Sequence, residues 1–339
     1  MKYRLLGKSG LKVSELCLGT MGFGQDWNWG ADYQTSKQIY DAFLNAGGNF
    51  IDTANLYTNG SSEKYLGDFM SAQRDHIVLA TKYTLSDNRS NTNVNGAGNN
   101  RKNMMRSVEE SLKRLGTDYI DLFYVHVWDG LTPVDEVMRG LEDLVTQGKV
   151  HYLGLSDTPA WIVSSAQTLA QVMGWNKLVA LQIEYSLIQR TPERDLLPMA
   201  NHFGISVLPW APLAGGALTG KYLNGDKGRL PDTSQRLNSR NTAIAQTVVS
   251  IARELQCDAS SVALQWIRQK NPGYIPIIGA TRVEQLLQNL KCLEVVLNEE
   301  QLHRLDAISS IELGFPHEFV LVESTREIIY GGFDHRIIR

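Results

Sequence analysis

Cysteine and long apolar runs are scarce in this sequence of 339 residues. The three cysteines, Cys17, Cys257 and Cys292, are widely spaced, which fits neither a disulfide scaffold nor a Cys-x-x-Cys metal site. No apolar run reaches the ~18–20 residues of a membrane-spanning helix, and the first residues have no apolar signal region. We therefore expect a cytoplasmic protein that holds no metal and has no membrane partner.

A surplus of one charge is missing as well. The 33 basic and 36 acidic residues give a formal net charge of −3, so nothing draws the chain to nucleic acid. Hydrophobic residues make up 43% of the chain and charged residues 20%, close to the globular average. A globular enzyme that acts on a small molecule is the simplest interpretation. The composition leaves its oligomeric state open.

Short apolar, β-branched runs alternate with longer amphipathic stretches along the chain. The predicted strands cover residues 15–18, 49–52, 77–81, 120–125, 152–155, 179–183, 206–209 and 274–278. The predicted helices cover residues 36–46, 62–70, 102–115, 133–147, 160–173, 192–203, 243–256 and 260–269. Pro133 and Pro159 each follow a threonine, which is typical of a helix whose first residue is proline.

Strands that alternate with helices run parallel, because each helix carries the chain back to the edge where the next strand starts. A closed barrel of eight strands and an open doubly wound sheet both have this pattern. The open sheet predicts Gly-x-Gly-x-x-Gly after the first strand, and residues 19–24 (GTMGFG) do not match. Eight such units without a linker favour an α/β fold of the (β/α)8 TIM-barrel type. We expect a single domain over residues 1–339, with a core at about 14–310 and a C-terminal tail at 311–339.

Three segments lie outside this alternation. Residues 86–100 are almost wholly polar, and residues 221–240 are too long for an ordinary connection between strand and helix. Both follow predicted strands, so we expect both on the face of the barrel where active sites form. The tail carries aromatic residues that predict docking on the barrel, namely Phe315, Phe319, Tyr330 and Phe333.

Asp52, Lys82 and His126 stand where predicted strands end, and Tyr57 follows Asp52 by five residues. Because the ends of all barrel strands meet at one mouth, these four side chains should converge. Lys82 would favour the phenolate of Tyr57 and lower its pKa from about 10, and Asp52 would hold Lys82 charged. Each residue alone also has an ordinary explanation: a turn-capping aspartate, a solvated lysine, a buried histidine or an exposed loop tyrosine.

The sequence around these four residues resembles the aldo-keto reductases. The matching segments, in order, are GTMGFG (19–24), FIDTANLYTNGSSEKYLG (50–67), Lys82, LGTDYIDLFYVHVWD (115–129), GKVHYLGLSD (148–157), LQIEYSLI (181–188), PWAPLAGGALTGKY (209–222) and IPIIGATRVEQLLQN (275–289). The resemblance covers almost the whole chain. It implies a (β/α)8 barrel that reduces aldehyde or ketone carbonyls to alcohols with NADPH.

The resemblance also implies the catalytic roles. Tyr57 would donate a proton to the developing alkoxide while hydride reaches the carbonyl carbon, with Asp52 and Lys82 supporting it. His126 would orient the carbonyl oxygen as a neutral imidazole. The potassium-channel β subunits, which are weakly active relatives, carry Asn at this position. His126 therefore favours a working reductase over a purely binding subunit.

The cofactor contacts follow from the same matching. Ser156, Asp157 and Gln182 would hold the nicotinamide carboxamide, with Trp210 stacked on its ring. Most relatives carry Asn or Arg in place of Asp157. The other implied contacts are Gly19, Thr20, Met21, Asp52, Ala211, Pro212, Leu213, Ala214, Gly215, Lys221, Arg236, Gly279, Thr281, Arg282, Gln285, Gln288 and Asn289.

Residues 215–221 (GGALTGK) also satisfy the Gly-x-x-x-x-Gly-Lys pattern of a P-loop. Tyr222 replaces the Ser or Thr that would bind Mg²⁺ there, so an ATPase or phosphotransferase is the weaker hypothesis. Barrels frequently bind phosphate after the seventh strand. We therefore interpret Leu213, Gly215 and Lys221 as contacts of the cofactor pyrophosphate.

Two further hypotheses concern cofactor choice and substrate. Arg282 opens a helix after the eighth strand, where its guanidinium suits the 2′-phosphate of NADPH; the alternative is a solvated charge at a helix start. A second group of residues crowds the loops after the first and fourth strands and predicts a substrate wall: Phe23, Trp27, Trp29 and Trp128. The alternative for this group is packing against the C-terminal tail.

Overall fold

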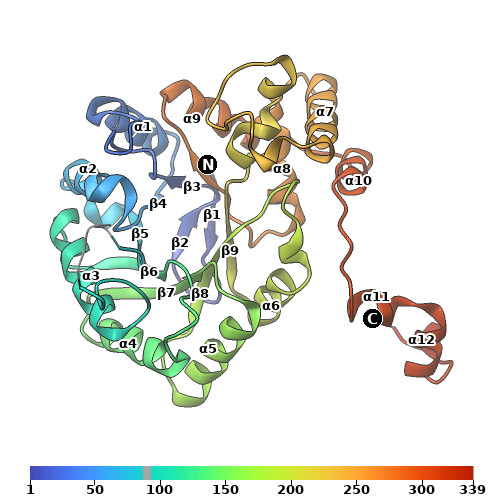
Figure 1. Ribbon diagram of the computed structural model, residues 1–339, viewed down its shortest axis with the longest axis horizontal. Coiled ribbons are helices and arrows are strands. Elements are labelled where there is room, and N and C mark those ends of the chain that lie inside the picture. Colours follow the sequence, from blue (N-terminus) through green and yellow to red (C-terminus); the bar gives the residue numbers. More distant parts are fainter. Residues whose placement is uncertain (87–92, 339) are drawn as a thin grey trace.

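Eight parallel strands form the centre of the computed structural model, which describes residues 1–86 and 93–338 (Figure 1). In chain order they are β3 (Cys17–Gly19), β4 (Phe50–Asp52), β5 (Val78–Tyr83), β6 (Ile120–Val125), β7 (Val150–Ser156), β8 (Leu178–Glu184), β9 (Ser206–Trp210) and β10 (Ile277–Gly279). From β3 to β9 each strand pairs with the next, and β10 pairs with β3 on its other side. The predicted (β/α)8 barrel is confirmed.

The last strand is divided at a proline. Residues 274–278 were expected to form one strand, but Tyr274 makes only an isolated bridge to Val207 of β9, and β10 begins at Ile277. Between them lies Pro276, which has no N–H to donate and so interrupts the hydrogen-bonded ladder. The bridge at Val207 brings the two edges of the sheet together and leaves the barrel nearly closed.

Helices surround the strands in the order that the alternation predicts (Figure 1). They are α1 (Tyr33–Asn45), α2 (Ser61–Met70), α3 (Arg101–Leu115), α4 (Val134–Thr146), α5 (Ala160–Met173), α6 (Leu196–Phe203), α7 (Ser239–Glu254), α8 (Ala259–Lys270), α9 (Val283–Leu290) and α10 (Glu299–Ile308). Pro133 and Pro159 have extended backbone and precede the first helical residue, one position earlier than expected. The helix expected at 192–203 is a 3₁₀ turn, η3 (Thr191–Glu193), followed by α6.

The alternation of side chains along each strand decides what reaches the inside of the barrel. The interior is filled by an apolar cluster that includes Cys17, Phe50, Val78, Ala80, Leu122, Tyr124, Ala180, Leu208 and Ile277. Residues two positions further along the same strands share this inward direction. Those residues are Asp52 after Phe50, Lys82 after Ala80 and Gln182 after Ala180. The strand period therefore turns polar side chains inward at the carboxyl ends of three strands.

A short hairpin that the sequence did not predict closes the opposite end of the barrel. Strands β1 (Tyr3–Leu5) and β2 (Lys12–Ser14) pair antiparallel. Leu6 and Val13 are fully buried in the interior cluster, and the Gly7 N–H donates to Ser206 Oγ at 2.8 Å. The hairpin thus covers the end of the barrel that lies opposite the carboxyl ends of the strands.

The C-terminal tail does not dock on the barrel, contrary to the expectation. Its helices α11 (His317–Leu321) and α12 (Glu323–Ile329) lie outside the ring of helices (Figure 1). Phe315 is 84% exposed, and Phe319 and Phe333 are each 56% exposed. No helix within residues 1–86 and 93–338 is both long and apolar enough to cross a membrane.

The hairpin gives a direct test of this architecture. Gly7 has φ +55°, and a Cβ built on it would lie 2.4 Å from the carbonyl oxygen of Val179. Gly7→Ala should therefore lower the free energy of unfolding by roughly 2–4 kcal/mol, measured by urea denaturation. Gly10 lies in the same hairpin loop, and a Cβ built on it would have no atom within 4 Å, so Gly10→Ala should change stability by less than ~0.5 kcal/mol. Equal effects of the two substitutions would contradict the close approach at Gly7.

Candidate active site

A buried lysine occupies the centre of the barrel mouth. Lys82 is fully buried, and its Nζ donates to Asp52 Oδ2 at 2.6 Å, to the Thr53 carbonyl at 2.7 Å and to Tyr57 Oη at 3.2 Å. Asp52, which is 2% exposed, accepts a second hydrogen bond at Oδ1 from Gln182 Nε2 at 2.8 Å. The mouth thus contains one continuous chain of contacts from β8 through β4 to β5 and on to Tyr57.

Tyr57 is positioned by an unusual turn, η1 (Tyr57–Gly60), that follows β4. Thr58 and Asn59 have φ of +46° and +53°, values that side chains other than glycine rarely adopt. The strain is supported by tertiary contacts, because Thr58 Oγ1 donates to the carbonyl of Phe23 at 2.5 Å and accepts from the Ser62 N–H. This turn directs the phenol back toward Lys82 instead of outward along the loop.

His126 lies on the other side of the phenol. Its ring meets that of Tyr57 edge-on, with centroids 5.8 Å apart and planes at 79°. Burial and the nearby Lys82 cation hold the pKa of His126 well below its ordinary value, so the imidazole is neutral at physiological pH. Its Nδ1 is buried and has no hydrogen-bond partner among the described residues.

Charged neighbours and burial shift the pKa values of Lys82 and Tyr57 in opposite directions. Burial disfavours the charged form of Lys82, but Asp52 and Tyr57 together outweigh it and raise the pKa of the ammonium group. For Tyr57, burial is the largest influence and raises the pKa of the phenol; Lys82 offsets this only in part. Lys82 thus acts on Tyr57 in the expected direction, but burial outweighs it, and the expected net fall of the pKa is wrong. The phenol is protonated at neutral pH and can donate.

The ends of strands β7 and β9, which flank β8, carry further polar side chains, Ser156, Asp157 and Trp210. Ser156 at the end of β7 is buried, and its Oγ has no partner among the described residues. Trp210 Nε1 donates to Asp157 Oδ1 at 2.9 Å, so these two residues are engaged with each other. Two residues that were not among the expected site residues also carry buried oxygens here. Oδ1 of Asn55 has no partner among the described residues, and Oη of Tyr124 faces Gln182. Tyr124 shares the inward period of β6, which is the signal that would have found it.

The loop after β9 combines a run of residues with positive φ with the cationic side chain of Lys221. Ala211, Ala214, Gly215 and Gly216 all have positive φ, and the Lys221 side chain lies over this turn, with Nζ 2.8 Å from a Cβ built on Gly216. Leu213 and Pro212 lie in the same turn. Consecutive residues of this kind form concavities that suit anions.

The long loop at 221–240 folds back over this turn. Arg236 donates to Glu184 Oε1 at 2.5 Å and lies near Gly215. The Arg229 guanidinium lies 4.5 Å from the Trp29 ring centroid, which joins the loop to the segment after β3. Of the other loop expected on this face, at 86–100, residues 87–92 lie outside the described residues. In the described part of this loop, Asn99 Nδ2 donates a hydrogen bond to Thr84 Oγ1 at 2.8 Å.

The structure rules out the P-loop interpretation. A P-loop passes directly into a helix whose first N–H groups face the phosphates. Here residues 214–219 form a 3₁₀ turn, η4 (Ala214–Thr219), and Lys221 begins another short 3₁₀ turn, η5 (Lys221–Asn224). The Gly-Lys pattern therefore has the residue types of a P-loop without its local structure.

The segment after β10 begins a helix, as expected. Thr281 N–H and Oγ1 both donate to Gln285 Oε1, at 3.0 and 3.2 Å. Arg282 precedes α9 with extended backbone, is exposed, and forms no ion pair with any described residue. Gln288 is also exposed, whereas Asn289 is buried. Gly279 ends β10 and pairs with Gly19 of β3, so this segment adjoins the start of the barrel.

The residues expected near the start of the barrel and in the substrate wall separate into two groups. Thr20 is buried, with Oγ1 donating to the Asp52 carbonyl at 2.9 Å, and Met21 is half-buried. Phe23 is fully buried and packs edge-on against Phe69 between the sheet and the helices, so it does not line the mouth.

The three tryptophans expected in the substrate wall, Trp27, Trp29 and Trp128, are half-buried. Trp27 and Trp29 lie with ring centroids 6.1 Å apart, and Trp27 Nε1 donates to Asn59 Oδ1 at 3.2 Å. Trp128 packs at the edge of the core. Because the C-terminal tail lies elsewhere, it does not cover these rings. Among the described residues, no three His, Cys, Asp or Glu side chains gather as metal ligands would.

Comparison with known proteins agrees with this architecture. Residues 15–310 match the model of the aldo/keto reductase family. The chain is 39% identical over 329 residues to an aryl-alcohol dehydrogenase (NADP+) of Phanerodontia chrysosporium, which covers 91% of this chain and 86% of that protein. It is 38% identical over 333 residues to norsolorinic acid reductase of Aspergillus flavus, covering 96% and 85%. An aryl-alcohol dehydrogenase of Pestalotiopsis microspora is 36% identical over 335 residues, covering 94% and 85%.

Proposed function

Because this chain belongs to the aldo/keto reductase family, we propose that it reduces the carbonyl group of aromatic aldehydes or ketones with NADPH, using Tyr57 as the proton donor. The observation that carries the proposal is the buried contact chain Asp52–Lys82–Tyr57. A protonated phenol that touches a fixed ammonium group at an open barrel mouth is suited to general acid catalysis.

The residues divide the work of a proton transfer. Tyr57 donates its proton to the carbonyl oxygen as negative charge develops there. Lys82 stabilises the phenolate left behind, and Asp52 holds Lys82 charged and in place at 2.6 Å. His126 is neutral, and its unpartnered Nδ1 belongs to a ring 5.8 Å from the phenol, so the imidazole can orient the substrate without competing for the proton.

Several features of the mouth fit NADPH, which supplies a hydride when bound. Ser156 Oγ is a buried hydroxyl that still lacks a partner, as a group that holds the nicotinamide carboxamide would be before binding. The turn at Gly215 and Gly216, with Lys221 over it, suits the pyrophosphate. At the adenosine end, Arg282 forms no ion pair with any described residue, so its guanidinium suits the 2′-phosphate. Gln182 and Trp210 complete the set around the nicotinamide.

Two observations favour an aromatic substrate. The proteins named above act, by their names, on aryl alcohols or on norsolorinic acid. Trp27 and Trp29 also expose ring surface beside the mouth, and an aromatic ring stacks well on such surfaces. We therefore expect aromatic aldehydes to be better substrates than aliphatic aldehydes of similar size.

Tyr57→Phe tests the proton donor. The substitution keeps the ring and removes the hydroxyl, so reduction of a panel of aromatic aldehydes should fall by roughly 10²–10⁴-fold while the dissociation constant for NADPH stays within a few-fold. NADPH consumption and tryptophan fluorescence quenching measure the two quantities. Unchanged turnover in the variant would exclude Tyr57 as the acid. A wild-type protein that binds NADPH without consuming it would instead be a binding subunit.

Arg282→Ala tests cofactor choice. Charge-assisted hydrogen bonds are worth ~1.5–3 kcal/mol, so loss of a contact to the 2′-phosphate should weaken NADPH by roughly ten- to a hundredfold. NADH has a hydroxyl at that position, and its dissociation constant should hardly change. Both constants are measurable by fluorescence titration. If both cofactors weakened equally, Arg282 would not be the group that recognises the 2′-phosphate.

A further inference from the structure

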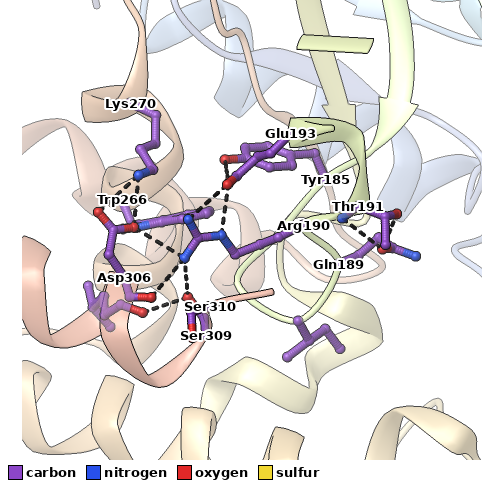
Figure 2. A network of polar contacts seen from close by, with 12 residues as sticks. Tyr185, Gln189, Arg190, Thr191, Glu193, Trp266, Lys270, Asp306, Ser309 and Ser310 are labelled. Carbon is purple, nitrogen blue, oxygen red and sulfur yellow. Dashed lines mark hydrogen bonds and ion pairs between the residues drawn. The ribbon is translucent and has the colours of Figure 1, made fainter. Parts of the chain in front are cut away.

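The point where the tail leaves the barrel is fastened by arginine (Figure 2). Arg190, only 8% exposed, donates from Nη1 to the Asp306 carbonyl at 3.0 Å and to Ser309 Oγ at 2.8 Å, both at the end of α10. Its other nitrogens, Nε and Nη2, pair with the two carboxylate oxygens of Glu193 at 2.8 and 2.9 Å. Lys270 approaches Asp306 from α8 at 2.8 Å. This network holds the last turn of α10 against the barrel.

Two more arginines extend the anchor into the tail. Arg240 Nη2 donates to the Ser309 carbonyl at 2.9 Å, and Arg194 Nη2 donates to the Glu312 carbonyl at 2.8 Å. Cations on the last carbonyls of a helix are stabilising, because those groups have no partner within the helix. These contacts hold the backbone against the barrel as far as residue 312, and beyond that residue the tail leaves the barrel (Figure 1).

Beyond this anchor the tail exposes an apolar surface. Its large hydrophobic side chains are 42–99% exposed: Phe315, Phe319, Val320, Leu321, Val322, Ile328, Ile329, Phe333, Ile337 and Ile338. At roughly 100 Å² of exposed area each, these ten side chains present on the order of 1,000 Å² per copy. Monomeric proteins rarely leave this much apolar surface uncovered within one short segment. Covering about half of this surface in each of two copies would bury on the order of 1,000 Å² of tail, which is near what a specific interface needs.

The barrel of the same chain offers an unpartnered helix face. Trp161, Ser165, Thr168 and Val172 lie at the spacing of one helical stripe on α5, and all four are exposed, Trp161 at 69% and Val172 at 76%. Ser165 and Thr168 are small, and with Leu169 and Val172 they line a shallow hollow. A bulky apolar side chain fits such a hollow between Trp161 and Val172. In Figure 1 the tail lies outside the ring of helices to which α5 belongs.

The tail is not a general part of the family barrel. The family model ends at residue 310. The alignment with the Aspergillus flavus reductase covers 96% of this chain and so leaves about 14 residues uncovered, fewer than the 29 residues of the tail at 311–339. At least part of the tail therefore matches that relative.

We propose that the chain forms a two-fold dimer in which the tail of each copy docks on the α5 face of the other. One molecule carries both the projecting apolar tail and an exposed helix face with two large apolar side chains, Trp161 and Val172, and leaves the two apart. Two copies can join both pairs at once by a symmetric exchange, which buries the same two surfaces twice. The anchored base favours this arrangement, because it directs the tail away from its own barrel.

Sedimentation velocity of the full chain at micromolar concentration tests the proposal. The molar mass obtained for the wild-type protein should be twice the 37.9 kDa of one chain. Phe319→Asp combined with Ile328→Asp should raise the dimer dissociation constant at least 100-fold, and so should Trp161→Asp combined with Val172→Asp. Glu323→Gln, also on α12, should leave the dimer intact. All of these positions are exposed and lie outside the proposed catalytic machinery, so thermal unfolding of the isolated chains and NADPH binding should be unchanged.

A mixture of the two double variants distinguishes tail exchange from other dimers. The intact tail of the α5 variant can dock on the intact α5 of the tail variant, so mixing two monomeric proteins should restore a weaker dimer with one of the two contacts. The proposal is overturned if the full chain is a monomer, if either double variant stays dimeric, or if the mixture stays monomeric. A monomer would mean that the tail folds back or serves another partner.

Discussion

The constraint on which the site depends is the complete burial of one positive charge, Lys82. An ammonium group inside a protein costs several kcal/mol unless it is paired and hydrogen-bonded. The structure meets this requirement with Asp52 at 2.6 Å, the Thr53 carbonyl and the Tyr57 hydroxyl. Asp52 is itself buried and needs Gln182 from β8, four strands further round the barrel. The site is therefore complete only when the sheet has curled round, which ties the chemistry of the mouth to the fold.

The same cation acts on every ionisable neighbour. It lowers the pKa of His126 together with burial, which keeps the imidazole neutral, and it partly offsets the effect of burial on Tyr57. Burial keeps the Tyr57 phenol neutral against the pull of this cation, whereas burial and the cation together keep the His126 imidazole neutral. One of the two neutral groups can donate a proton and the other can orient a substrate. The strained turn after Tyr57 and the filled opposite end of the barrel keep these groups at a single opening. Electrostatics, backbone geometry and packing thus act on the same few side chains.

Much of this arrangement was predictable, and the failures have physical causes. The eight units follow from the alternation of strand and helix patterns, and the convergence of Asp52, Lys82 and Gln182 follows from the period of two along each strand. The hairpin at residues 3–14 was missed because its strands are three residues long, too short to show a strand period. Phe23 was misplaced because composition does not indicate which side of the sheet a loop aromatic faces. The pKa of Tyr57 was misjudged because the depth of burial is a tertiary property. The prediction that the tail docks on its own barrel was wrong for another reason. Apolar residues in a sequence show that a surface needs to be covered, but they do not identify the surface that covers it.

The most direct test of this account is the pKa of Tyr57 in the wild-type protein and in variants of Lys82. It is measured by alkaline absorbance titration, and the titration of the same protein with Tyr57→Phe is subtracted to isolate the signal of Tyr57. In Lys82→Met the cation that offsets burial is gone, so the pKa of Tyr57 should rise further. The alkaline decline of carbonyl reduction should move to higher pH with it, while overall turnover falls sharply. Lys82→Arg retains the charge and should restore the wild-type titration in part. A Tyr57 titration that is unchanged in Lys82→Met would contradict the central role of the buried cation.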